Sequence, residues 1–497
     1  MLSRSNVNYE GRKPRRVANS NAAVAHLPTF EPAKITPRGP QPMDDGGLPP
    51  FSFVSLDMCQ SENNVNHRTS VYLHKRLVVR RGHEFFLKIT FSSQYIEHTH
   101  KFEVEFTIGE SPDSNEGTHI VLEFALGEIN GPWACRVVEN VGNTVKIGIT
   151  PSPDCIVGKF HTYVVVDAWD GRHRSPIDEN SIIYILFNAW CSDDDVSLPD
   201  ESQRTAYIMA DSGVVYTGQA EQFSARPWEF GQFEQNILDY CIDILDDSKM
   251  SLYNRGNVIQ VTRKVSALVN SQDDYGILEG KWRGSYAMGT APTAWTSSVD
   301  ILEKYATTKS PVCYAQCWVY ACVFNTIMRC LGIPCRVVTN FCSAHDNTGN
   351  LKTDIVIDEN GRMLKERCKD SIWNYHCWNE GYMKRGDLPV GFDGWQILDA
   401  TPQETSEGIY CCGPAPVKAI KAGLLCYPFD ARFIFAEVNS NIHYHLLKPN
   451  GTTEMIHIDK TYVGRLILTQ DVIPNAAKDI TNDYKPLEGK TPKISPP

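Results

Sequence analysis

The hydrophobic periodicity of this chain changes once, near residue 190. Between residues 70 and 187, apolar residues alternate with polar ones, as from Phe102 to Ile108 and from Val145 to Ile149. A period of two residues is that of a strand with one buried face. Successive short strands with no helical stretch between them indicate an antiparallel β-sandwich of the immunoglobulin-like type.

Farther along the chain, apolar residues recur at steps of three and four, as from Phe233 to Leu245, which is the period of one buried helix face. The clearest helix begins near Cys317 and ends where Gly332 stops it. Strands are expected from Arg336 to Asn340 and in a hairpin whose turn is Asn360-Gly361. The second part of the chain is therefore predicted to be an α+β domain.

A chain of 497 residues can hold several cores, and its composition divides it into three parts. Residues 1–45 are rich in proline and poor in large apolar side chains, a composition that cannot repay the entropy of ordering. They are expected to form a flexible arm. Residues 46–187 are assigned to the β-sandwich, and residues 188–497 to the α+β domain.

Charge and hydropathy exclude several classes of function. A net charge of −11 argues against a general nucleic-acid binder, because affinity for phosphate needs clustered Lys and Arg. The chain has no run of about 18 apolar residues and no apolar segment behind its basic start, so we expect neither a membrane span nor a secretory signal. The expected compartment is the cytoplasm, where most of the sixteen cysteines would be free thiols.

Three residues of the α+β domain carry side chains suited to nucleophilic catalysis. Cys317 stands at the expected helix start, where unpaired N–H groups and the helix dipole favour a thiolate. His376 lies among aromatic residues, and Asp399 ends an apolar stretch. Taken singly, each has an ordinary alternative: a small buried residue, a packed core histidine and a turn former.

The segments around these positions resemble the active-site motifs of the transglutaminases. Residues 314–319 read YAQCWV and are similar to the family's G-Q-C-W-V motif, and residues 373–380 read WNYHCWNE, similar to its histidine motif. Residues 394–404, GWQILDATPQE, match the segment that bears the family's aspartate. The similarity runs from about residue 70 to residue 489. One departure is Ala315, where the family has Gly, but the added methyl group removes no catalytic atom.

The resemblance implies a multidomain fold, an immunoglobulin-like β-sandwich followed by an α+β papain-like transglutaminase core. It also implies a protein-glutamine γ-glutamyltransferase in which the Cys317 thiolate attacks a glutamine side chain and leaves a thioester. His376 would protonate the departing ammonia, and Asp399 would orient the imidazole. A lysine amine then forms the isopeptide bond. By resemblance, Trp282 helps to stabilise the oxyanion and, with Trp373, walls the tunnel for the amine.

Calcium is the cofactor that the resemblance implies. The residues that fall at the family's principal calcium site are Asn439, Asn441 and Glu488, and those at a further site of some members are Asp346, Asn350 and Asp370. Their oxygen atoms suit a hard cation. Because Asn441 replaces the usual Asp, calcium is expected to bind weakly.

The start of the chain and the core segment 255–271 resemble the blood-clotting branch of the family. Pro37-Arg38-Gly39 is similar to a thrombin site in an activation peptide, so a thrombin-like protease is expected to cut between Arg38 and Gly39. That branch implies fibrin-like substrates bearing Gln and Lys, allows a homodimer, and adds release to extracellular fluid or plasma without a signal peptide. Since members continue into two β-barrels, residues 188–497 are expected to be a core incomplete at its C-terminal end, in a form lacking the barrels.

Two other classes of function compete with the crosslinking enzyme. A papain-like protease shares the Cys and His but would cut a chain rather than join two. A non-catalytic transglutaminase-like scaffold usually goes with a lost nucleophile, whereas Cys317, His376 and Asp399 are all present here. The residues favour the enzyme, and detection of an isopeptide product would separate the three.

Overall fold

The computed structural model describes residues 51–124, 129–168, 171–273 and 275–485, all within one compact unit of the chain. The predicted arm, residues 1–45, lies outside the described residues, together with its cleavage position Arg38–Gly39. Glu488 of the predicted calcium site lies outside them as well.

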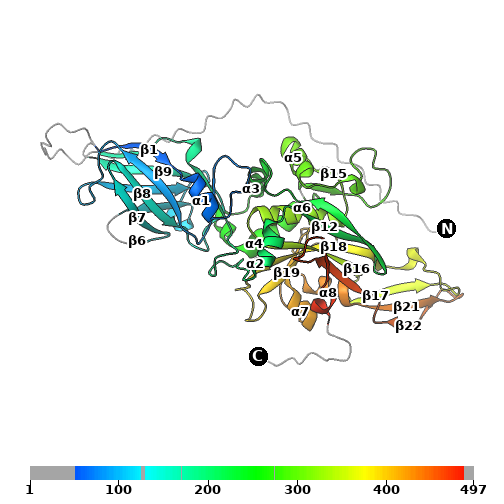
Figure 1. The fold of residues 1–497 in the computed structure, drawn as a ribbon. Coiled ribbons are helices and arrows are strands. Elements are labelled where there is room, and N and C mark those ends of the chain that lie inside the picture. Colours follow the sequence, from blue (N-terminus) through cyan, green and yellow to red (C-terminus); the bar gives the residue numbers. More distant parts are fainter. Residues whose placement is uncertain (1–50, 125–128, 169–170, 274, 486–497) are drawn as a thin grey trace. The chain divides into compact units, whose positions relative to one another are not determined.

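The first part of the described chain is the predicted β-sandwich (Figure 1). One sheet has the order β1-β3-β8-β7-β6: β1 (Phe53–Asp57), β3 (Phe85–Phe91), β8 (Thr144–Thr150), β7 (Ala134–Val141) and β6 (Ile129–Asn130). The other has the order β2-β11-β9-β4-β5, with β10 beside β9: β2 (Leu77–Arg80), β11 (Ile182–Leu186), β9 (Gly158–Ala168), β4 (Lys101–Thr107), β5 (His119–Glu123) and β10 (Gly171–Arg174). Helix α1 (Gln60–Asn66) follows β1. Only β2 and β11 pair in parallel among these strands.

Alternation of apolar and polar residues fixes which face of a strand such as β3 is buried in the sandwich, whereas β2 and β11 are buried at every residue. In β3, Phe85, Leu87, Ile89 and Phe91 are fully buried, while the residues between them are partly or fully exposed. Each large apolar side chain removed from water stabilises the fold by roughly 1.5–3 kcal/mol. The alternating stretches that predicted strands lie in β4 and β8. The boundary placed at residue 187 stays a prediction.

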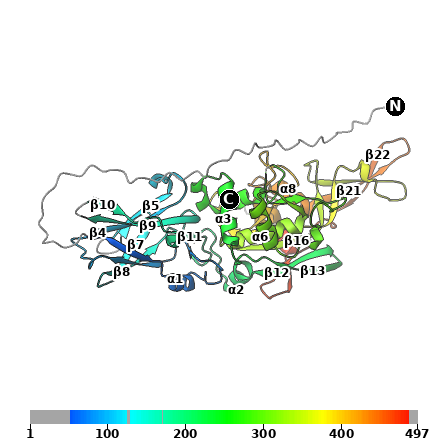
Figure 2. The same ribbon diagram turned by 90° about the horizontal axis from the view of Figure 1, so that it is seen from above.

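The second part of the chain is an α+β core. Its main antiparallel sheet has the order β20-β19-β18-β16-β23-β24: β20 (Cys412–Pro416), β19 (Gly394–Asp399), β18 (Ser371–Met383), β16 (Cys335–His345), β23 (Leu466–Gln470) and β24 (Ala477–Asp479). Smaller sheets are the hairpin β12 (Ser212–Gln219) and β13 (Gln222–Glu229), the parallel pair β14 (Leu278–Gly280) and β15 (Val312–Ala315), and the three strands β17 (Lys352–Ile357), β21 (Asn441–Leu447) and β22 (Thr453–Asp459). Figure 2 shows the hairpin β12–β13 beside β16.

The helices of this core are short, except for α6. They are α2 (Glu201–Arg204), α3 (Ile237–Asp247), α4 (Val258–Leu268), α5 (Val299–Thr308), α6 (Cys317–Cys330), α7 (Val417–Ala422), α8 (Ala431–Asn439) and α9 (Thr481–Tyr484), with a π-helical turn at Thr205–Met209. Among the described residues, no helix is both long enough and apolar enough to cross a membrane.

Helix α6 is buried along its whole length and packs against β16 and β18. As predicted, it starts at Cys317 and stops just before Gly332, whose φ of 91° suits glycine. A Cβ at that position would lie 2.4 Å from the carbonyl oxygen of Phe187, so no larger residue fits. From the sandwich side, the Tyr72 hydroxyl donates to the carbonyl of Cys330 at 2.8 Å. These contacts fix the helix that presents Cys317.

Two local predictions differ from the structure. Helix α3 begins at Ile237 rather than Phe233, because Asn236 adopts a left-handed conformation with φ 68° that interrupts the helix. The Asn360-Gly361 turn forms, but the described residues that follow it form no hairpin strand and make only a single bridge, from Met363 to Ile357. Instead, β17 pairs in parallel with β21, a distant partner that local turn signals cannot reveal.

Candidate active site

Cys317 is the first residue of α6 and is 4% exposed. Strand β15 leads into the helix, and Gln316 between them is extended, so the helix begins at the cysteine. The Gln316 amide donates to the carbonyl of Lys281 at 3.0 Å, which fixes this junction. All sixteen cysteines of the chain lie in the described part, and all are free thiols.

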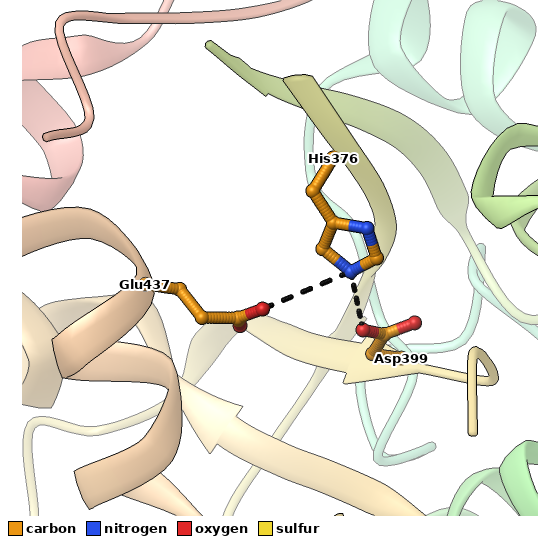
Figure 3. A group of neighbouring side chains, drawn as sticks. All are labelled: His376, Asp399 and Glu437. Atoms are coloured by element: carbon orange, nitrogen blue, oxygen red, sulfur yellow. Dashed lines mark hydrogen bonds and ion pairs between the residues drawn. The ribbon is translucent and has the colours of Figure 1, made fainter. Parts of the chain in front are cut away.

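His376 and Asp399 meet on neighbouring antiparallel strands, β18 and β19. Nε2 of His376 lies 2.7 Å from Oδ2 of Asp399 (Figure 3). The other oxygen of Asp399 accepts the backbone N–H of Thr401 at 2.8 Å. Because a carboxylate can only accept, Nε2 carries the hydrogen, and Nδ1 is left for the thiol. Nδ1 is buried and makes no other hydrogen bond of ordinary geometry within the described residues.

The charge states of Cys317 and His376 depend on each other. Burial acts to raise the pKa of the Cys317 thiol, but contacts with Cys377 and His376 and the charge of His376 outweigh it and lower this pKa to about 5. Burial also opposes the charged form of His376, yet the charge and hydrogen bond of Asp399 raise its pKa well above the ordinary value. At neutral pH the pair is therefore thiolate and imidazolium, the reactive form of such a pair.

Two residues that sequence reasoning did not single out complete this cluster. Glu437 projects from α8, is 1% exposed, and places Oε1 3.8 Å from Nε2 of His376 (Figure 3). Burial raises the pKa of Glu437 to about 8; His376 opposes this rise and Asp399 adds to it. Gln403 donates to Asp399 Oδ2 at 3.0 Å and to Glu437 Oε1 at 2.9 Å. Gln403 stood within a recognised motif, whereas a lone Glu in a helix is usually exposed and gives no signal.

The donor atoms of His376, Asp399 and Glu437 all lie within 4.8 Å of one another, a spacing that metal centres share. The amide nitrogen of Gln403 lies 3.0 Å from Nε2 of His376 and about as close to the two carboxylates, so it fills the point on which they converge. The arrangement is therefore accounted for by hydrogen bonds among side chains.

Trp282 and Trp373, the predicted tunnel residues, lie near each other beside the cluster, with ring centroids 6.4 Å apart. The Trp373 ring packs edge-on against His376, with centroids 5.3 Å apart. Trp282 stacks on Tyr320 of α6 at 6.5 Å and is 39% exposed. The two rings form an apolar wall that leads from His376 toward solvent.

The two described members of the principal calcium set occupy one corner of the core. Asn439 ends α8 and Asn441 begins β21, and both are half-buried. Ser440 between them is held by a hydrogen bond of 2.7 Å between its hydroxyl and that of Thr353. The two asparagines are therefore two residues apart at this corner, and side-chain amide oxygens are suitable calcium ligands.

The second calcium set lies where a loop surrounds the buried side chains of Asp346 and Asp370. Asp346 accepts the backbone N–H groups of Thr348, Asn350 and Leu351, at 3.1, 3.3 and 2.6 Å. Asp370 accepts those of Asn347 and Asp354, at 3.0 and 2.9 Å. Burial raises the pKa of Asp370, and the charges of Asp346 and Asp354 add to this rise. A concentration of negative charge of this kind fits a cation, although backbone groups already engage several of the oxygens.

Comparison with known proteins agrees with this geometry. A family model described as "Transglutaminase family" matches residues 54–167, and one described as "Transglutaminase-like superfamily" matches residues 282–400. The human coagulation factor XIII A chain is 45% identical over 99% of this chain and 67% of its own length. The chain belongs to the transglutaminase family. The resemblance drawn from the motifs and the predicted fold class are thereby confirmed.

Other relatives cover a smaller share of their own length. Human protein-glutamine gamma-glutamyltransferase K is 43% identical over 87% of this chain and 53% of its own length. The crystal structure of red sea bream transglutaminase has a TM-score of 0.79 and 38% identity, over 88% of this chain and 66% of that one. The chain thus spans about two thirds of factor XIII A chain and about half of transglutaminase K.

Proposed function

We propose that this chain is a calcium-dependent protein-glutamine γ-glutamyltransferase, which joins protein glutamine to protein lysine. The observation that carries the proposal is the burial of Cys317 at the start of α6 and of His376 on β18, with Asp399 hydrogen-bonded to the imidazole at 2.7 Å. Relatives named protein-glutamine gamma-glutamyltransferase support it. Cys317, His376 and Asp399 are the proposed catalytic residues.

In the first half-reaction, the Cys317 thiolate attacks the carbonyl carbon of a glutamine side chain. The C–N bond breaks, His376 gives its Nδ1 proton to the leaving nitrogen, and ammonia departs. The acyl group remains as a thioester on Cys317. Asp399 stabilises the imidazolium before the transfer and holds the ring in place after it.

The oxyanion of this step needs hydrogen-bond donors near Cys317. The backbone N–H of Cys317 belongs to the first turn of α6, where N–H groups have no partner within the helix. We assign the second donor to Trp282, whose indole lies beside α6. Removal of one such donor typically costs about 10²–10³ in rate.

In the second half-reaction, a lysine amine enters along Trp282 and Trp373 and loses a proton to neutral His376. The amine nitrogen attacks the thioester carbon, the C–S bond breaks, and an isopeptide bond forms with release of the Cys317 thiolate. Water would yield glutamate instead. The apolar wall of the two tryptophans supports crosslinking over hydrolysis, because it disfavours water at the thioester.

Calcium is the proposed cofactor, held at a principal site by Asn439 and Asn441 with Glu488, and at a further site by residues of the second set. When bound, calcium supplies positive charge that fixes loop geometry and takes no part in bond making. Helix α8 carries both Glu437, beside His376, and Asn439, so the calcium corner and the catalytic cluster share one helix. Since Asn441 is neutral, we expect weak binding.

We further propose fibrin-like protein substrates, a homodimer, and activation by a thrombin-like protease at Arg38–Gly39, all by likeness to factor XIII A chain. The cleavage is tested by digestion with thrombin and sequencing of the new N-terminus. A start at Gly39 is the expected result, and no cut or another start would refute it.

The test of the main proposal is incorporation of a fluorescent primary amine into a glutamine-bearing protein, with calcium and with a chelator. Calcium-dependent incorporation, with isopeptide bonds identified by mass spectrometry, is the expected result. Cleavage of the acceptor protein would indicate a protease. An absence of both reactions in folded protein would indicate a scaffold.

A further inference from the structure

Two carboxyl groups, not one, face the imidazole nitrogen that orients His376. Oδ2 of Asp399 lies 2.7 Å from Nε2, and Oε1 of Glu437 lies 3.8 Å from it. An N–H of an imidazole in a fixed plane makes one strong hydrogen bond, so these two groups compete for it. A further interaction is therefore needed to keep Asp399 closer to Nε2 than Glu437 is.

The side chain placed to do this is Gln403. Its amide nitrogen lies 3.0 Å from Asp399 Oδ2 and 2.9 Å from Glu437 Oε1. Because Nε2 of His376 already carries a hydrogen toward Asp399, the two N–H hydrogens of Gln403 go one to each carboxyl group. The bond to Asp399 is the stronger of the two, because hydrogen bonds to charged groups are about twice as strong as neutral ones.

We propose that Gln403 is a positioning residue that bridges Asp399 and Glu437 and thereby keeps Asp399 as the only carboxyl group hydrogen-bonded to Nε2 of His376. This deepens the proposed function, on which it rests. Gln403 acts through Asp399 and His376, so it is not itself a catalytic residue. It is half-buried, and its side chain closes the cluster.

The position of the Glu437 side chain is constrained by its surroundings. Its backbone carbonyl accepts the side-chain N–H of Asn340 at 2.9 Å, which fixes α8 against β16. Its second oxygen, Oε2, is buried without a hydrogen-bond partner among the described residues. An unpaired buried oxygen gains by approaching any available donor or acid. Without the bridge, the nearest such partners are His376 and Asp399.

The decisive substitution is Gln403→Met, which keeps the length of the side chain and removes both N–H donors. We expect kcat to fall by about 10- to 100-fold with little change in KM, because the loss is in orientation of the imidazole rather than in substrate contact. Gln403→Glu, which adds a third carboxyl group to the cluster, should lose more. Gln260→Met, on the exposed face of α4, is the matched control and should leave both constants unchanged.

A second substitution separates positioning from simple loss of packing. If Glu437 is the competitor, Glu437→Gln in the Gln403→Met background should restore activity to within about fivefold of the parent. A side chain with a merely structural role would give additive losses instead. Additive losses in the double variant would therefore overturn the proposal.

A third readout does not need transferase activity. The rate of alkylation of Cys317 by iodoacetamide, measured against pH, reports the thiolate that His376 stabilises. The groups that face this pair are Asp399, Glu437, Cys377, Tyr375 and Cys322. Gln403→Met should move the midpoint of the profile upward by about one pH unit, and Glu437→Gln should move it back.

The outcomes distinguish failure of this inference from failure of the proposed function. If no variant, nor the parent, incorporates amine while the alkylation midpoints shift as expected, Gln403 positions the pair but the proposed reaction is wrong. If activity is present and the midpoint in Gln403→Met equals that of the parent, the positioning role is wrong.

Discussion

The β-sandwich and the α+β core bury different kinds of side chain. The space between the sandwich sheets is filled by apolar residues such as Phe106, Ile147 and Phe160. The centre of the core also buries His376 and Asp399, with Glu437 beside them. Burying charge costs free energy unless it is paired, and the hydrogen bonds among His376, Asp399, Gln403 and Glu437 provide that pairing. The buried charged residues of the core are explained by the proposed reaction, and the apolar interior of the sandwich by its contribution to stability.

The largest effect expected from this contrast is the loss of activity in Cys317→Ala. The substitution removes the nucleophile and a single sulfur from a buried site, so amine incorporation should fall by about 10⁴-fold or more. Stability should change little, since Cys and Ala differ by one atom. Incorporation assays with matched thermal unfolding check this. Activity retained in Cys317→Ala would remove the proposed role of this residue.

The converse substitution is Phe160→Ala in the sandwich, where the ring is fully buried and packs edge-on against Trp133 with centroids 6.1 Å apart. It should lower the free energy of unfolding by about 3–5 kcal/mol through the cavity that it leaves. At a temperature where the variant stays folded, alkylation of Cys317 should keep the parent's rate. A drop in that rate would mean that the sandwich core shapes the site directly.

The pH dependence of Cys317 alkylation tests the same contrast, because it reports the ion pair of Cys317 and His376 in the core. Since the pKa of the thiol is lowered to about 5, the thiolate is fully formed at neutral pH and its fraction falls about tenfold per unit below pH 5. An ordinary thiol, with a pKa of about 8.5, loses reactivity below pH 8. Iodoacetamide kinetics from pH 4 to 9, with circular dichroism to monitor folding, distinguish the two profiles. A midpoint near 8.5 would exclude the ion pair.

The smallest effect is expected at the calcium corner. Asn439→Ala removes one neutral oxygen ligand, so calcium affinity should fall by only about three- to tenfold, while alkylation of Cys317 without calcium should not change. Titration calorimetry measures the affinity, and Asn360→Ala in an exposed turn is the matched control. An affinity equal to the parent's would show that the principal site lies elsewhere.

The sequence predicted those parts of the molecule that rest on local patterns. Alternation placed β4 and β8, and three- and four-residue steps placed α6 with Cys317 at its start. His376 and Asp399 were predicted from their similarity to family motifs, since local periodicity alone cannot bring distant residues together. The bridge of Gln403 and Glu437 was not, since it depends on how α8 packs against β16. The same reason explains why the parallel pairing of β17 with β21 was missed.

The most direct test of the central claim is the mass of the chain after exposure to a glutamine peptide with calcium and without any amine. The proposed reaction predicts an adduct equal to the peptide mass minus ammonia, attached to Cys317 and released by an added amine. Free ammonia should appear in equal amount. An unmodified chain, or an adduct on another of the cysteines with Cys317 unlabelled, would contradict the account.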